Sequence, residues 1–85
     1  MESFSYVITD PLGIHARPAG MITKLAMTFE SEITLQTQTA VADAKRIMAV
    51  MRLVAKQGTS VMVICKGKDE AQAAKALKEF LQENL

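Results

Sequence analysis

The residues best suited to chemistry in this sequence are His15 and Arg17, which follow a turn that contains glycine. Imidazole is a covalent nucleophile, and a phosphoryl group carried on its nitrogen is readily passed to another acceptor. A guanidinium group offers a planar set of donors that matches the oxygens of phosphate. The pattern indicates phosphate handling at His15. The alternative, on spacing alone, is a solvated histidine beside a loop.

The helix predicted to begin near His15 or Ala16 has an unusual charge pattern at its N-terminus. Acidic or neutral capping residues normally stand at that end, because it carries partial positive charge and unpaired N–H groups. No Asp or Glu occurs between Asp10 and Glu30, and cations in a first turn cost about 0.3–1 kcal/mol each. A bound phosphate would offset this cost. The same dipole favours a neutral imidazole, which keeps a lone pair for attack.

The residues around His15 fit a phosphate cradle. Backbone N–H groups of Ala16 and Arg17 are expected to complete it. Pro18 would stiffen the first turn, where its missing N–H has no intrahelical partner. Gly13 would allow the chain to bend tightly just before the helix.

Hydrophobic periodicity predicts the elements that must position these residues. Phe4, Tyr6 and Ile8 alternate along the chain in the manner of a half-buried strand. Strands are predicted over residues 3–9, 32–36, 40–43 and 60–66, with turns at Gln38–Thr39 and at Gly58. Helices are predicted from residue 15 or 16, between 45 and 54, and after Asp69, which has capping-box spacing to Gln72.

Each predicted helix carries one apolar stripe. The three stripes are Ile22, Leu25, Ala26 and Phe29; Ile47, Val50, Met51 and Val54; and Ala73, Leu77, Phe80, Leu81 and Asn84. Helices with a single stripe predict packing on one face of a four-stranded sheet whose other face meets water. The expected fold is therefore a two-layer α+β domain over residues 1–85, in the order β-α-β-β-α-β-α.

Length and composition exclude several functional classes. A chain of 85 residues, 49% hydrophobic and 22% charged, has room for one globular core. A net charge of +1 argues against nucleic acid as the main ligand. The N-terminus lacks a signal-peptide pattern, and no apolar run reaches the roughly 20 residues that cross a bilayer.

Cys65 is the only cysteine, so no internal disulfide can form, and a buried, inert thiol in a cytoplasmic chain is expected. One histidine without a cysteine cluster argues against a metal site. No cofactor motif occurs, so no cofactor and no self-contained enzyme are expected.

The segment from Gly13 to Ala19, Gly-Ile-His-Ala-Arg-Pro-Ala, resembles the active-site signature of HPr, the family of histidine-containing phosphocarriers of the bacterial phosphotransferase system. The segment from Ala44 to Met51 is similar to the family's second-helix segment. The resemblance covers the whole chain. It implies an open-faced β-sandwich, with a four-stranded antiparallel sheet and three helices on one face.

The family resemblance also implies a function. A monomeric cytoplasmic carrier, rather than an independent enzyme, would accept a phosphoryl group on Nδ1 of His15 from phosphorylated enzyme I, which phosphoenolpyruvate charges. It would pass the group to enzyme IIA of a sugar transporter while Arg17 steadies it. The implied partner surface comprises Arg17, Gly20, Met21, Lys24, Ile47, Met48 and Met51.

Exposure of that surface follows in part from spacing. Met48 lies off its helix stripe and is expected to be exposed, whereas Met51 fits core and surface equally well. Lys24, Lys45, Arg46 and Arg52 would form a basic rim that attracts acidic partners, or else a merely solvated face.

Four departures from the family pattern stand out. Arg46 replaces a serine that a regulatory kinase phosphorylates in many members, so we expect no serine-phosphate switch here. Leu12 removes a polar residue beside the active site, Gln38–Thr39 replaces a glycine-containing turn, and Val54 stands where glycine is common. These last three are expected to change local stability or loop shape rather than the reaction.

Two other functions use the same residues. One is an HPr-like regulatory phosphorelay that is not dedicated to sugar uptake. The other is a binding module that retains the fold without turnover, and the presence of both His15 and Arg17 argues against it.

Overall fold

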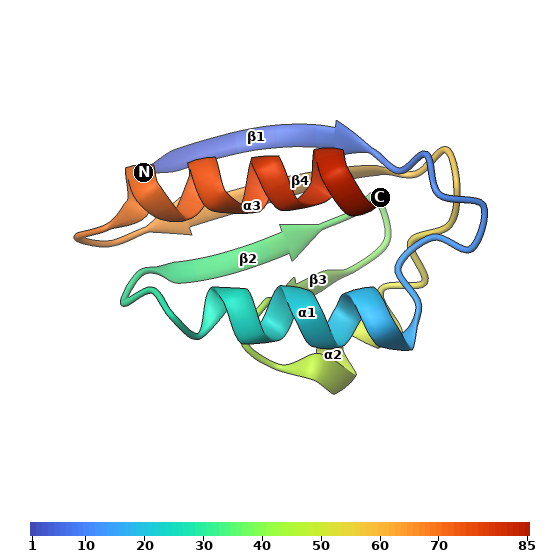
Figure 1. Ribbon diagram of the computed structural model, residues 1–85, viewed down its shortest axis with the longest axis horizontal. Coiled ribbons are helices and arrows are strands. Elements are labelled where there is room, and N and C mark those ends of the chain that lie inside the picture. Colours follow the sequence, from blue (N-terminus) through green and yellow to red (C-terminus); the bar gives the residue numbers. More distant parts are fainter.

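A computed structural model describes all residues from 1 to 85 (Figure 1). Its elements are β1 (Glu2–Val7), α1 (Ala16–Ala26), β2 (Glu32–Gln36), β3 (Val41–Asp43), α2 (Ile47–Arg52), β4 (Ser60–Lys66) and α3 (Glu70–Asn84). This order is the one predicted from periodicity. The first strand ends two residues earlier than predicted, because Ile8 and Thr9 already belong to the loop that leads toward His15.

The four strands form one antiparallel sheet in the order β1-β4-β2-β3. Val63 in the central strand β4 lies between Phe4 of β1 and Leu35 of β2. Val63 and Leu35 are buried, while the residues that alternate with them along β4 and β2 are mostly exposed. One sheet face therefore forms the core and the other faces solvent, as the period of two requires.

The three helices cover the buried face. Helix α3 packs along β1 and β4, and α1 packs against both α3 and α2 (Figure 1). Ile22 and Ala26 of α1 are fully buried, together with Ala73, Leu77 and Leu81 of α3. The predicted fold class is confirmed. None of these helices combines the length and the apolar character of a transmembrane segment.

The second helix differs from its prediction. It ends at Arg52, and of its predicted stripe only Val50 is buried. Leu53 takes the core position that the pattern gave to Val54, and Val54 lies outside the helix with a left-handed φ of 51°. Leu53 follows the buried Val50 by three residues and so stays on the buried face, and after the turn at Val54 the next residue, Ala55, is buried as well.

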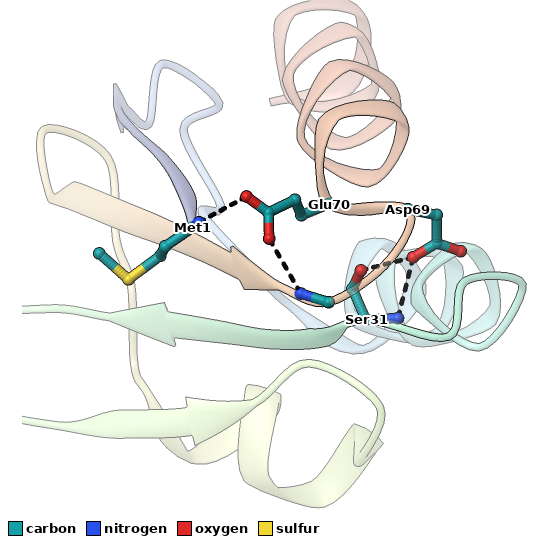
Figure 2. A network of polar contacts seen from close by, with 5 residues as sticks. Met1, Ser31, Asp69 and Glu70 are labelled. Carbon is teal, nitrogen blue, oxygen red and sulfur yellow. Dashed lines mark hydrogen bonds and ion pairs between the residues drawn. The ribbon is translucent and has the colours of Figure 1, made fainter.

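The capping box predicted at Asp69 and Gln72 is wrong. Asp69 occupies the N-cap of α3, but its carboxylate makes no capping hydrogen bond. Instead it accepts hydrogen bonds from the backbone N–H of Ser31 at 2.9 Å and from the Ser31 hydroxyl at 2.5 Å (Figure 2). The backbone N–H of Glu30 also donates to this carboxylate, at 2.9 Å. The carboxylate whose spacing to Gln72 suggests a local cap therefore bonds to a segment 38 residues away instead.

The two carboxylates at the start of α3 have different partners. Glu70 accepts hydrogen bonds from the amino group of Met1 and from the N–H of Gly67 at 3.1 Å (Figure 2). These bonds lower the pKa of Glu70, with the Met1 amino group as the larger cause. Together Asp69 and Glu70 join the start of α3 to the residues just before β1 and β2 and to the turn after β4.

Replacing Asp69 with asparagine is expected to lower the melting temperature by roughly 10 °C at pH 7, because an amide is a weaker acceptor and brings an unwanted donor. Hydrogen bonding by Ser31 is the main cause that lowers the pKa of Asp69 below its ordinary value of 3.8. The stabilisation is therefore present above pH 3.8 and is lost as the pH falls through the folded-state pKa. Thermal unfolding of the wild type and the Asp69→Asn variant between pH 2 and pH 7 measures this stabilisation. A difference in melting temperature that stays constant with pH would contradict the role of the Asp69 carboxylate.

Two further expectations concern single residues. Cys65 is fully buried, and burial raises the pKa of its thiol, which keeps it protonated and unreactive. The spacing predicts that Asn84 belongs to the buried stripe of α3, and this prediction is wrong. Asn84 is exposed and donates to the carbonyl of Phe80 at 3.0 Å, while Leu85 occupies the buried position after it.

Candidate functional site

The loop before His15 is shaped by Asp10. The Asp10 carboxylate accepts the N–H of Leu12 at 2.8 Å, and its carbonyl accepts the N–H of Gly13 at 2.9 Å. Both bonds form a tight turn that ends at Gly13, whose φ of +67° favours glycine. The turn reverses the chain from β1 toward the start of α1.

Backbone contact with Ala55 and Lys56 holds this loop in place. The N–H of Ile14 donates to the carbonyl of Ala55 at 2.8 Å, and both residues are buried. A Cβ atom at Gly13 would overlap the Ala55 carbonyl oxygen and approach Cα of Lys56 to 2.7 Å. The absence of a side chain at Gly13 therefore permits the contact that fixes the residue before His15.

His15 itself is the N-cap of α1. Its backbone is extended, with φ −100° and ψ −170°, and its carbonyl accepts the N–H of Ala19 at 2.9 Å. Its side chain is exposed and makes no capping bond. The main-chain N–H groups of Ala16 and Arg17 have no hydrogen-bond partner, so they are available to an anion beside the imidazole.

An open hollow of about 230 Å³ lies at this helix end. Its lining residues are Asp10, His15, Arg17, Pro18, Met21 and Asn84. The structure thus places His15 and Arg17 in the lining of the same hollow. Asp10 and Asn84 were not predicted to lie here: no local motif pairs the first loop with the last helical turn, and only the fold places them side by side.

The electrostatic character of the site favours an anionic ligand. The first turn of α1 holds no acidic residue, and Arg17 is exposed and makes no ion pair. Oδ1 of Asp10, the acidic group of the hollow, is engaged by the Leu12 N–H. Arg17 and two unpaired N–H groups therefore remain to attract an oxyanion.

The predicted partner surface is continuous with this site because α1 packs against α2. A Cβ atom at Gly20 would lie 3.4 Å from Cδ1 of Ile47, so the small residue allows the two helices to approach closely. The exposed fractions are 41% for Met21, 41% for Ile47, 58% for Met48 and 37% for Met51. Met48 is exposed as expected, and Met51 lies at the surface rather than in the core.

Basic residues border a groove beside these apolar side chains. The groove, of about 540 Å³, is lined by Thr23, Met27, Lys45, Arg46, Ile47, Met48, Ala49 and Arg52. Lys45 donates to the carbonyl of Phe29 at 2.7 Å, so its amine is partly engaged, whereas Arg46 and Arg52 form no ion pair. No acidic residue lines the groove. The sequence did not indicate that Thr23 and Met27 would line this groove.

Comparison with known proteins decides the family. Residues 2–83 match the family model described as the PTS HPr component phosphorylation site. The chain belongs to the HPr family. The phosphocarrier protein HPr of Lysinibacillus sphaericus is 41% identical over 83 residues, which cover 98% of this chain and 94% of that protein.

Solved structures of HPr proteins share the fold. The histidine-containing phosphocarrier protein of Mycoplasma superposes with a TM-score of 0.94 at 38% identity, covering 96% of this chain and 93% of the other. HPr from Thermoanaerobacter tengcongensis gives a TM-score of 0.92 at 34% identity, covering 98% and 93%. The dimer of that HPr also matches, with a TM-score of 0.77 at 34% identity and 98% and 95% coverage. The open-faced sheet with three helices is thus the HPr fold.

Proposed function

We propose that this protein carries a phosphoryl group on Nδ1 of His15, accepting it from phosphorylated enzyme I and donating it to an enzyme IIA. The observation that supports this most strongly is the free anion site beside an exposed imidazole. His15 stands at the end of a helix where the N–H groups of Ala16 and Arg17 are unpaired and no carboxylate occupies the first turn.

The transfer step requires little beyond correct placement. The lone pair on Nδ1 attacks phosphorus, a phosphorus–nitrogen bond forms, and the bond to the donor group breaks with its electron pair returning to the donor. The guanidinium group of Arg17 and the two N–H groups stabilise the charge on the equatorial phosphoryl oxygens during this exchange. The exposure of His15 allows both partners to reach the ring. Delivery to the acceptor reverses the same step.

Docking would use the exposed apolar residues of α1 and α2 together with the basic rim. Met21, Met48 and Met51 supply flexible, polarizable contacts, which suit a surface that binds a donor and an acceptor in turn. Arg46 and Arg52, free of intramolecular ion pairs, would attract partners with acidic surfaces and speed their encounter. We place the carrier in the cytoplasm and propose a monomer as its working form, which sedimentation equilibrium would test.

Position 46 gives this carrier a fixed positive charge on the docking face. Arg46 is exposed at the N-cap of α2, and no serine or other hydroxyl residue lines the adjoining groove except the buried Thr23. We therefore propose that the serine-phosphate control of other members is absent. Incubation with the family's serine kinase and ATP should leave hydroxyl side chains unmodified.

Replacing Arg46 with glutamate is expected to slow phosphorylation by enzyme I about tenfold at low salt, because the docking face then repels an acidic partner. The difference should shrink as salt rises, since exposed charges are screened. Lys75→Glu makes the same charge change on the exposed surface of α3 and serves as the control. Equal slowing by both variants would contradict a local role for Arg46.

A relay assay tests the proposed function as a whole. The protein is incubated with enzyme I, Mg²⁺ and labelled phosphoenolpyruvate, and an enzyme IIA is then added. Label should appear first on this chain and then move to enzyme IIA. Label that stays on the chain with every enzyme IIA but moves to a different acceptor would favour the regulatory phosphorelay instead.

A further inference from the structure

Val54 is the only residue other than glycine with a left-handed backbone, at φ 51°. It directly follows Leu53, the C-cap of α2, and so occupies the position at which helices commonly use glycine. A β-branched side chain is among the least suited to this conformation, because its Cβ substituents crowd the backbone. Local preference alone would place the backbone of Val54 in the β or right-handed helical region.

The neighbours of Val54 impose the conformation. Leu53 and Ala55 on either side are 4% and 2% exposed, whereas Val54 itself is 63% exposed. Burial of the flanking residues thus holds the turn, and the valine side chain adds little packing of its own. Strained residues persist where the surrounding structure determines them, and such sites cluster at functional positions.

The strained residue connects the two halves of the proposed site. Before it lies α2, which carries Ile47, Met48 and Met51 of the docking surface. Immediately after it, the carbonyl of Ala55 accepts the Ile14 N–H that fixes the loop before His15. Farther along, Gly58 donates to the carbonyl of Ile8 at 2.8 Å, which ties the same two loops together again.

We propose that the strained backbone of Val54 weakens the hydrogen bond by which Ala55 holds the loop carrying His15, so that the imidazole can adapt to two different partners. The first half of this proposal, that Val54 weakens the hold on the loop, concerns local stability alone. The second half, that the weakened hold helps His15 to serve two partners, rests on the proposed function. Val54 acts through the Ala55–Ile14 hydrogen bond and is a positioning residue, since it touches no reacting atom.

Amide hydrogen exchange of Ile14 tests the first half. Val54→Asn relieves the strain, because asparagine tolerates the left-handed region, whereas Val54→Thr keeps a β-branched residue and hence the strain. The asparagine variant should reduce local opening at Ile14 about tenfold, the factor that corresponds to the cost of a left-handed backbone, and the threonine variant should match the wild type. The amide of Val63 in the central strand serves as the reference for global unfolding. Equal Ile14 opening in the two variants would overturn the proposal.

Phosphorylation kinetics test the second half. With enzyme I as donor, Val54→Asn should lower kcat several-fold with little change in KM, while Val54→Thr keeps both. With phosphoramidate, a small reagent that phosphorylates histidine without an enzyme, all three proteins should react equally, because a small donor needs no adaptation of the loop. Unchanged transfer from enzyme I in an asparagine variant with slowed Ile14 exchange would overturn the functional half. Failure of enzyme I to phosphorylate the wild type would instead refute the proposed function. The exchange comparison would still show whether strain at Val54 weakens the hold on the loop.

Discussion

Replacing Gly13 with alanine is expected to lower the free energy of unfolding by about 3 kcal/mol. Two effects add. The φ of +67° is unfavourable for any residue with a Cβ atom, and that atom would overlap the Ala55 carbonyl and lie 2.7 Å from Cα of Lys56. Neither neighbour is the flexible end of a side chain, so the backbone itself must move.

Gly58→Ala provides a matched control for this substitution. Gly58 also has a positive φ, of +88°, but an added Cβ atom would meet nothing within 4 Å. The Gly58→Ala variant should therefore lose only about 1 kcal/mol of unfolding free energy, the cost of the backbone conformation. Urea unfolding of the three proteins measures both values, and equal losses in the two variants would contradict the close contact between Gly13 and residues 55–56. Gly13→Ala should also slow phosphorylation of His15, because the bond between Ile14 and Ala55 would be displaced.

Replacing Arg17 with alanine is expected to slow phosphoryl transfer about 100-fold, the usual loss when one stabilising donor is removed from the reacting group. The free energy of unfolding should stay within about 0.5 kcal/mol of the wild type, because Arg17 is exposed and forms no ion pair. Arg17→Lys should recover part of the rate, since an ammonium group keeps the charge but not the planar set of donors.

Arg52→Ala is the control for the charge of Arg17. It removes a cation from the basic rim without touching the hollow beside His15, so it should affect the encounter with enzyme I more than the chemical step. Stopped-flow or quench kinetics at saturating enzyme I separate the two. A marked fall in melting temperature of Arg17→Ala would show that Arg17 has a structural role rather than a functional one.

Much of the fold follows from local patterns. The period of two in β2 and β4, and the stripes of α1 and α3, each depend on residues whose burial is set by a single sheet face. Helix α2 was less predictable, because its six residues bury only Val50. Its true end depends on the left-handed turn at Val54, where tertiary packing of Leu53 and Ala55 overrides the preference of valine.

Two placements that local patterns did not predict depend on segments far apart in the sequence. The spacing of Asp69 and Gln72 is that of a local cap, yet Asp69 binds Ser31 instead (Figure 2). Asn84 fitted a helical stripe, although it lies in the hollow beside His15. Ser31 lies 38 residues from Asp69, and the hollow that Asn84 lines is formed with the first loop, so no local pattern could reveal either placement. The proximity of His15 and Arg17 was predictable because both lie within the first turn of one helix.

The most direct test of the account is the chemical nature of the phosphorylated residue. The protein is incubated with enzyme I, Mg²⁺ and labelled phosphoenolpyruvate, beside the variant His15→Ala, whose fold should persist because His15 is exposed and makes no side-chain cap. The account predicts label on the wild type that is labile in acid and stable in alkali, and none on the variant. Label that survives the His15 substitution, or that is stable in acid, would contradict it.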